Sequence, residues 1–328
     1  MKKIGTICYA TNSGLGILAK EFFDNDVVHE ILVIKHPLLE NFYHSWYPGA
    51  RVTDINPPDQ IVEEFVKNID VLLLFETGFS NNICNIAKNN NVKVVLMPMY
   101  ECSPLLNKPD ALIAVSDLDY DYCKDLYPDI PVVRINVPAH SKINWKQRTI
   151  AKKFFHNAGN ISFFDRNGTF ALINAMSFVK SPIKLQIRCQ NKDILPTDKI
   201  ELLSKNMPFD EIWDENDCFI FVERYNGLSM PLQESFSAGC LVIAGNRKPV
   251  NSWLPKAPLV DPQNYQVHSI QPHLNFLCAN YNPIEIAKKI DEFFETDITK
   301  FSLAGKVWGE ENSWSNLRNV YKNLLENV

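Results

Sequence analysis

The sequence predicts an α/β protein built from two Rossmann-like halves, each a parallel sheet flanked by helices. Short apolar runs recur along the chain, helical patterns separate them, and the alternation pauses at a polar stretch and then restarts. Near-continuous runs of Val, Ile and Leu are typical of strands that are buried on both faces, as in parallel sheets. A length of 328 residues leaves room for two such domains.

The first half contains six apolar runs that predict strands, at residues 4–10, 30–34, 70–75, 92–97, 111–115 and 132–137. Helical patterns lie between them, at 15–23, 60–68, 81–89 and 118–126. Strand–helix alternation of this kind indicates a doubly wound sheet.

The second half repeats this alternation after a polar stretch, residues 138–149, that suits a linker. It predicts strands at 154–158, 184–189, 218–222 and 240–244, and helices at 168–178, 231–238, 284–295 and 314–327. In open α/β sheets, ligands bind beyond the carboxyl ends of the strands. We therefore predict two Rossmann-like domains that face each other across a cleft, with the functional site in that cleft.

Composition narrows the class of protein. The formal net charge is −5, whereas dedicated nucleic-acid binders usually carry a strong basic excess. No apolar run approaches the ~20 residues that span a bilayer. The histidines show no HExxH spacing and the cysteines no CxxC pair, so no metal site is expected. We also expect no resident cofactor. We predict a cytoplasmic protein, with peripheral attachment to a membrane left open.

The first candidate site follows the first predicted strand. Gly14, Gly16 and Ala19 match the GxGxxA pattern, in which glycines let the backbone approach phosphates at a helix N-terminus. The acidic residue that should bind a ribose about 20 positions later is missing, because Lys35 and His36 stand there. A glycine turn near the cleft is therefore a better interpretation than NAD(P) binding, and packing alone remains an alternative.

The second candidate site joins His156, at the end of a predicted strand, to the segment Asp165–Thr169, which opens a helix. Arg166 and the amides of a helix N-terminus would together suit a diphosphate. A surface turn is the alternative, because Asp, Asn and Gly are common turn residues.

The third candidate site is residues 224–245, RYNGLSMPLQESFSAGCLVIAG. The order of residues predicts a strand end, a glycine loop, a helix that opens with a proline, a glycine cap and another strand. The loop amides of Gly227, Leu228 and Ser229 would point at an anion, and Glu234 would lie one turn into the helix, facing a ligand's hydroxyl groups. The alternative for Glu234 is a surface position near a favourable helix dipole.

This third segment resembles the signature of the retaining glycosyltransferases of family four, also called glycosyl transferases group 1. Their pattern runs roughly EGFGLPxxEAxAxGxPV, and the match extends over about twenty residues in order and spacing. Two weaker similarities are the segment from His156 to Thr169, which resembles the family's Gly-Arg…Lys-Gly, and Ser313-Trp314 before the last helix.

The resemblance implies a GT-B fold, with an acceptor domain at 1–145, a nucleotide-sugar domain at 146–312 and a C-terminal helix, 313–328, that returns to the first domain. It implies that Glu234 holds the ribose of the donor and that Arg166 neutralises the leaving diphosphate in place of a metal. The implied donor-binding set is Gly14, Gly16, Arg166, Asn167, Asn226, Gly227, Leu228, Ser229 and Glu234.

The sequence departs from the family pattern at two positions. Asn226 replaces the first glutamate of the Glu-x7-Glu motif, and Asn167 replaces a lysine. The histidine that many relatives carry in the N-terminal domain is not evident. Glu76 and Glu101 instead follow predicted strands there, where either could orient an acceptor hydroxyl, and capping or packing roles are the alternatives.

The function that follows is transfer of a sugar, with retention, from a nucleoside diphosphate sugar to a hydroxyl of a glycan, a lipid-linked or another acceptor. One alternative is a phage-type transferase acting on hydroxymethylated DNA bases, against which the acidic charge balance argues. Another is a pseudo-enzyme that binds a nucleotide sugar or glycan without turnover, suggested by Asn226 and Asn167. An NAD(P) oxidoreductase is the third.

Overall fold

The computed structural model describes residues 1–36, 42–99, 108–159, 165–189, 194–203, 211–271 and 274–328. The chain divides into two compact units. Unit 1 comprises Met1–Pro138 together with Trp314–Val328, and unit 2 comprises Ala139–Ser313. The boundary falls at the start of the polar stretch that the sequence predicts as a linker, seven residues before the predicted domain limit at 145.

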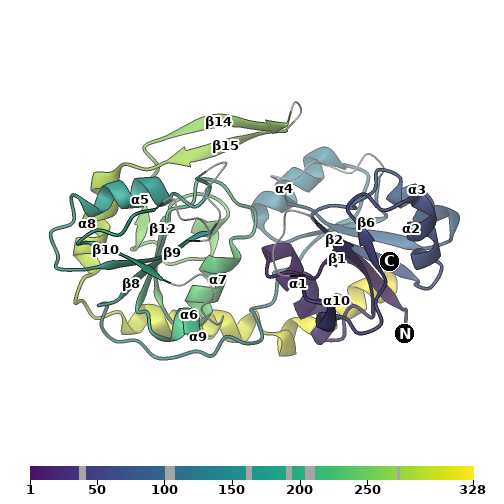
Figure 1. The fold of residues 1–328 in the computed structure, drawn as a ribbon, viewed down its shortest axis with the longest axis horizontal. Coiled ribbons are helices and arrows are strands. Elements are labelled where there is room, and N and C mark those ends of the chain that lie inside the picture. Colours follow the sequence, from purple (N-terminus) through teal and green to yellow (C-terminus); the bar gives the residue numbers. More distant parts are fainter. Residues whose placement is uncertain (37–41, 100–107, 160–164, 190–193, 204–210, 272–273) are drawn as a thin grey trace. The chain divides into compact units, whose positions relative to one another are not determined.

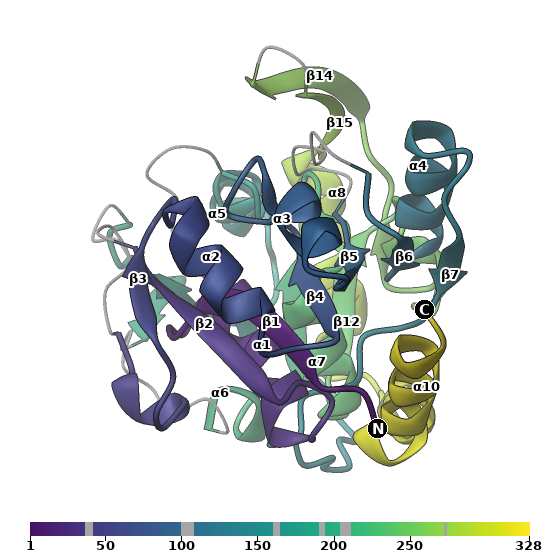
Figure 2. The same cartoon turned by 90° about the vertical axis from the view of Figure 1, so that its right-hand side faces the viewer.

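Unit 1 (Figure 1) is built on a seven-stranded parallel sheet in the order β3-β2-β1-β4-β5-β6-β7, whose strands are labelled in Figure 2. Its strands are β1 Ile4–Tyr9, β2 Glu30–Lys35, β3 Val52–Asp54, β4 Val71–Phe75, β5 Lys93–Met97, β6 Ala111–Ala114 and β7 Val132–Arg134. All residues of β4 and β6 are buried. Burial on both faces explains why these strands are continuous apolar runs in the sequence.

The helices of unit 1 are α1 Gly14–Asp24, α2 Asp59–Val66, α3 Ile83–Asn89, α4 Asp117–Leu126 and α10 Trp314–Asn327, with a 3-10 turn at His44–Trp46. The C-terminal helix α10 packs on α1. The ring centroid of Phe22 lies 5.0 Å from that of Trp314 and 4.8 Å from that of Tyr321. Trp314 also donates a 2.8 Å hydrogen bond to Glu21. The last helix is thus part of the core of unit 1.

Unit 2 contains a six-stranded parallel sheet in the order β10-β9-β8-β11-β12-β13. Its strands are β8 Phe154–Gly159, β9 Leu185–Cys189, β10 Ile200–Leu203, β11 Cys218–Phe221, β12 Leu241–Gly245 and β13 Leu259–Val260. In both units the first strand pairs with the second on one side and with the fourth on the other, which is the Rossmann-like order. The switch point of unit 2 therefore lies between β8 and β11.

The helices of unit 2 are α5 Thr169–Met176, α6 Glu211–Asp214, α7 Met230–Ser237, α8 Pro283–Phe293 and α9 Thr299–Glu311, with a 3-10 turn at Val250–Ser252. An antiparallel hairpin of β14 Asn264–Gln271 and β15 Leu274–Asn280 separates β13 from α8. The hairpin projects from unit 2 (Figure 2). Sequence reasoning missed it, along with α9 and the short strands β3, β10 and β13.

No helix among the described residues is long and apolar enough to cross a membrane.

Candidate functional site

The loop between β11 and α7, residues 222–229, is shaped by the side chain of Asn226. The Asn226 Oδ1 atom accepts hydrogen bonds from the amides of Leu228 and Ser229, at 3.1 and 3.0 Å. Ser229 adopts a left-handed conformation with φ 58°, and α7 begins directly after it. Gln233, on α7, donates to the Leu228 carbonyl at 3.1 Å. Two of the amides that the sequence assigns to a diphosphate therefore donate to Asn226 in this structure.

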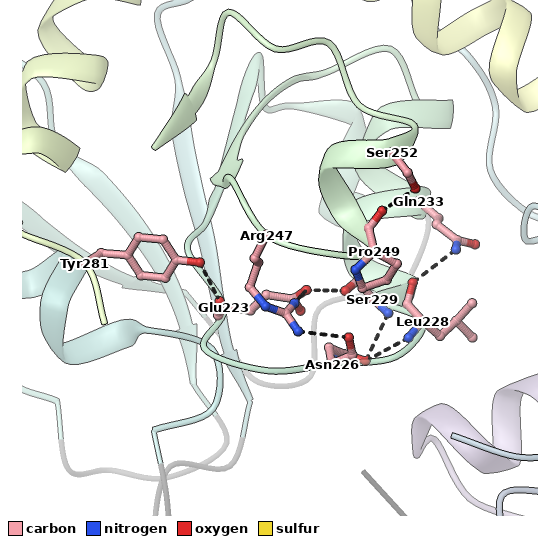
Figure 3. Close-up of polar contacts among 9 residues, drawn as sticks. All are labelled: Glu223, Asn226, Leu228, Ser229, Gln233, Arg247, Pro249, Ser252 and Tyr281. Carbon is pink, nitrogen blue, oxygen red and sulfur yellow. Dashed lines mark hydrogen bonds and ion pairs between the residues drawn. The ribbon is translucent and has the colours of Figure 1, made fainter. Parts of the chain in front are cut away.

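A buried ion pair joins this loop to the segment that follows β12 (Figure 3). Arg247 Nη1 is 3.0 Å from Glu223 Oε1, and the two side chains are 4% and 0% exposed. The Ser229 hydroxyl also donates to Glu223, and Arg247 Nη2 donates to the Asn226 carbonyl at 3.2 Å. Such a pair is tolerated in the interior only when hydrogen bonds offset the desolvation of both charges. The pair thus ties the loop to the end of β12.

Sequence reasoning missed Glu223 and Arg247, which lie 24 positions apart. Each follows the apolar run of a strand, β11 for Glu223 and β12 for Arg247, and these two strands pair in parallel. Opposite charges after the carboxyl ends of neighbouring strands were the signal that could have linked them.

The connection between β8 and α5 is closely packed against the start of the β11–α7 loop. Gly168 has φ 74°, and a Cβ atom there would lie 2.2 Å from the Val222 carbonyl oxygen, so only glycine fits. Asp165 caps α5 by accepting the amides of Thr169 and Phe170 at 2.7 and 2.8 Å. Residues 165–169 therefore lead into a helix, as the sequence predicts, and the alternative of a surface turn does not hold.

His156 and Asn167 hold this connection from within. His156 is fully buried, with Nδ1 2.8 Å from the Ile220 carbonyl oxygen and Nε2 2.8 Å from the Thr169 hydroxyl. Burial lowers the pKa of His156 to about 4, so the ring is neutral at pH 7. Asn167 donates to the carbonyls of Asn157 and Ala158, each at 3.0 Å. Both side chains thus form hydrogen bonds that hold the β8–α5 connection in place.

Arg166 lies beside the β11–α7 loop. Its guanidinium carbon is 5.5 Å from the centroid of the Tyr225 ring, within cation–π range. The Arg166 carbonyl accepts the amide of Arg224 at 2.8 Å. The structure therefore places Arg166 beside the loop that contains Asn226.

Glu234 lies on α7 and is 8% exposed. Burial lowers the pKa of Arg188, at the end of β9, and the negative charge of Glu234 opposes that shift. Glu234 thus lies in the same electrostatic environment as a second cation, one that sequence reasoning did not identify.

In unit 1, the two glycines of the first loop differ in surroundings. A Cβ atom at Gly16 would lie 2.2 Å from the Thr11 carbonyl oxygen, whereas one at Gly14 would meet no atom within 4 Å. Ser13 caps α1 by accepting the Gly16 amide at 3.1 Å. Gly16 is thus needed for packing, and Gly14 has room beside it.

Glu76 follows β4 with φ 61°, and its amide donates to the Met97 carbonyl at 2.9 Å. Burial raises the pKa of Tyr9 to about 12, and the negative charge of Glu76 adds to this shift. The Glu76 carboxylate is therefore near the end of β1. Glu101, the other predicted acceptor-side glutamate, lies outside the described residues. Among the described residues, no group of three His, Cys, Asp or Glu side chains is placed to hold a metal.

No protein-family model and no curated protein matches the sequence. Solved structures do match the fold. A glycosyltransferase from Rickettsia africae has a TM-score of 0.68 at 14% identity, covering 100% of this chain and 99% of its own. Anabaena HepE, in complex with UDP and glucose, has a TM-score of 0.70 at 10% identity, with full coverage of both chains. Sucrose-phosphate synthase from Thermosynechococcus elongatus has a TM-score of 0.69 at 12% identity, again over both full chains.

These similarities extend over the whole chain, and together with the two Rossmann-like sheets they establish the GT-B fold of glycosyltransferases. The fold class predicted from the sequence is thereby confirmed.

Proposed function

We propose that this chain is a retaining glycosyltransferase that transfers a sugar from a nucleoside diphosphate sugar to a hydroxyl group without a metal. One observation carries the proposal. Arg166, from the β8–α5 connection, lies against the loop that presents Asn226 and leads to Glu234, at the switch point of a Rossmann-like sheet. Ligands bind at such switch points in open α/β sheets. HepE, which shares the fold, has been crystallised with UDP and with UDP-glucose.

The proposed chemistry depends on charge that develops as the donor bond breaks. Negative charge grows on the oxygen of the leaving diphosphate, and a fixed guanidinium stabilises it most strongly at that moment. Arg166 supplies this cation, which is the reason for proposing a reaction without metal. The amide end of α7 adds positive potential, whereas that of α5 is already capped by the Asp165 carboxylate. Glu234 accepts hydrogen bonds from the donor's ribose.

Asn226 receives a different role from that of the family's glutamate. Its Oδ1 atom holds the amides of Leu228 and Ser229. We propose that Asn226 shapes the loop, and that the sugar is selected by the neighbouring backbone. The same proposal includes the roles expected of Gly14, Gly16 and Glu76. It also includes an acceptor that is a glycan or a lipid-linked molecule, and a cytoplasmic location.

Calorimetric titration with UDP, GDP, ADP and dTDP, in the presence of EDTA, tests the donor site. We expect one nucleotide to bind, and Glu234→Ala to weaken it at least roughly tenfold through the loss of charge-assisted hydrogen bonds. Glu285→Ala is the matched control, because Glu285 is half exposed and paired with Lys288 on the surface of the same unit. Equal effects of the two variants, or no nucleotide binding at all, would contradict the proposal.

Turnover is tested separately. Incubation of the matching nucleotide sugar with EDTA should release nucleoside diphosphate slowly even without an acceptor, and NMR of the released sugar should show the donor's anomeric configuration first. Binding without any release or transfer would favour the pseudo-enzyme. Transfer to hydroxymethylated DNA would identify the DNA-modifying alternative.

A further inference from the structure

The β14–β15 hairpin is tied at its base to the β11–α7 loop. The Ala279 amide donates to the Arg224 carbonyl at 2.8 Å, and Arg224 Nη2 donates to Asn280 Oδ1 at 3.0 Å. The hydroxyl of Tyr281, the next residue, donates to the Glu223 carbonyl at 3.1 Å (Figure 3). Three consecutive residues at the end of the hairpin therefore hold two consecutive residues of the loop.

Aromatic and cationic side chains continue this connection toward Arg166. The Tyr225 ring is 6% exposed, and its centroid lies 6.5 Å from that of His268 on β14, with the rings 28° apart. Tyr225 also lies beneath the Arg166 guanidinium, at 5.5 Å. The Arg224 amide bonds the Arg166 carbonyl, so backbone and side chain of Arg166 both contact residues that the hairpin holds.

We propose that Tyr225, supported by the β14–β15 hairpin through His268, is a positioning residue that fixes the Arg166 guanidinium for the donor diphosphate. This inference rests on the proposed function. A guanidinium that lies over an aromatic ring keeps its N–H groups at its edge, where they can donate to phosphate oxygens in a bidentate arrangement. Orientation by the ring also reduces the side-chain entropy that Arg166 would lose on binding.

Substitution of Tyr225 should raise the Kd of some ligands and not of others. A nucleoside diphosphate requires Arg166, whereas the matching monophosphate lacks the second phosphate. The probes are the diphosphate that binds most tightly among UDP, GDP, ADP and dTDP, and its monophosphate. We expect Tyr225→Leu to raise the Kd for the diphosphate roughly 3- to 30-fold, the range that a cation–π contact supports, and the Kd for the monophosphate less than about twofold.

Three further variants separate positioning from a structural role. Tyr225→Phe keeps the aromatic ring and should bind the diphosphate with the same Kd as the unmodified protein. Arg166→Ala should weaken diphosphate binding, and adding Tyr225→Leu should then cause no further loss, because the ring acts through Arg166. His268→Ala should weaken binding in the same direction by a smaller factor, and it tests the inference even if Tyr225→Leu does not fold. Tyr265→Ala, an aromatic residue 48% exposed on the same strand, is the matched control and should have no effect.

Independent, multiplicative effects of Arg166→Ala and Tyr225→Leu would overturn the inference and leave the proposed function standing. So would equal losses for diphosphate and monophosphate, or His268→Ala indistinguishable from Tyr265→Ala. Absence of diphosphate binding by the unmodified protein, or full binding by Arg166→Ala, would overturn the proposed donor site as well.

Discussion

The first strand–helix connection of each unit occupies the same place in the same sheet topology, but the two are fixed differently. In unit 1, the glycine contact of the connection after β1 is internal: Ser13 caps the Gly16 amide, and Gly16 packs on the Thr11 carbonyl. The outer part of this connection is held by Tyr43, which bonds Asn12 and Ala10. In unit 2, the connection after β8 is fixed by the loop after β11: Gly168 packs on the Val222 carbonyl, and the Arg166 carbonyl accepts the Arg224 amide.

The difference has a mechanical consequence. The contact of Gly16 lies within one connection and can be altered without moving the next loop of the sheet, whereas the loops after β8 and β11 of unit 2 share contacts and should respond together. Substitutions that remove a contact shared between elements couple energetically, whereas separate ones add. The proposed donor site is therefore expected to behave as one cooperative element of unit 2.

Removal of the buried Arg247 cation should have the largest effect on the proposed cooperative element of unit 2. Arg247→Met leaves the Glu223 carboxylate in the interior without its ion pair, which should destabilise unit 2 by about 3–5 kcal/mol. The control is Arg51→Met in unit 1, since Arg51 and Glu64 are 48% and 46% exposed and such pairs contribute at most about 1 kcal/mol. Hydrogen exchange read by mass spectrometry reports each unit separately. Similar small losses for both variants would show that the ion pair does not stabilise the loop.

The second largest expected difference between the units is their loss of stability at acidic pH. His156 has its pKa lowered by burial to about 4, so the unfolded chain takes up a proton first as the pH falls. The contribution of His156 to the free energy of unfolding is complete above pH 6.5. It falls by about 3 kcal/mol as the pH drops from 6.5 to 4. The described histidines of unit 1, His29, His36 and His44, are half-buried or exposed. Hydrogen exchange from pH 7 to 4.5 should therefore show unit 2 loosening first.

The control for this pH effect is His156→Asn, which removes the titrating ring. It should flatten the pH dependence of unit 2 in this range, because carboxyl groups titrate mostly below it. A slope that persists in His156→Asn would assign the acid sensitivity to other groups.

The parts of this fold that sequence analysis found are those with a strong local signal. Strands such as β4 are buried on both faces and read as unbroken apolar runs. The hairpin strand β14 lacks that signal: Tyr265 and Val267 are 48% and 69% exposed, and their polar neighbours Asn264, Gln266 and His268 are exposed or half-buried. The edge strand β3 has only three residues, too few for a period to be read.

The candidate site divides in the same way. Asn226 and Glu234 belong to one contiguous motif, so their order and spacing were visible. Arg166 could be named, but its contact with Tyr225 depends on two loops that only the sheet order brings together. The Glu223–Arg247 pair depends on the adjacency of β11 and β12, and the support from His268 depends on a hairpin that was not predicted. Contacts between elements were the part that local patterns could not supply.

Three alanine substitutions test the contrast between the two connections directly. At Gly168 an alanine would have φ 74° and meet the Val222 carbonyl, and at Gly16 it would meet the Thr11 carbonyl. Each should be destabilising by about 1–3 kcal/mol, since the backbone has to shift or accept strain. Gly14→Ala enters open space at the start of a helix, and its effect should stay within about 0.5 kcal/mol.

The decisive observation is which residues exchange their amide hydrogens faster in each variant. Gly168→Ala pushes on the carbonyl from which the β11–α7 loop starts, so exchange should accelerate in residues 222–229 as well as in 165–172. Gly16→Ala should accelerate exchange around residues 11–20 and leave the next loop of its sheet, after β4, unchanged. If Gly168→Ala affected only its own connection, the loops of unit 2 would be as independent as those of unit 1. Positioning of Arg166 by Tyr225 would then have to operate through the side chains alone.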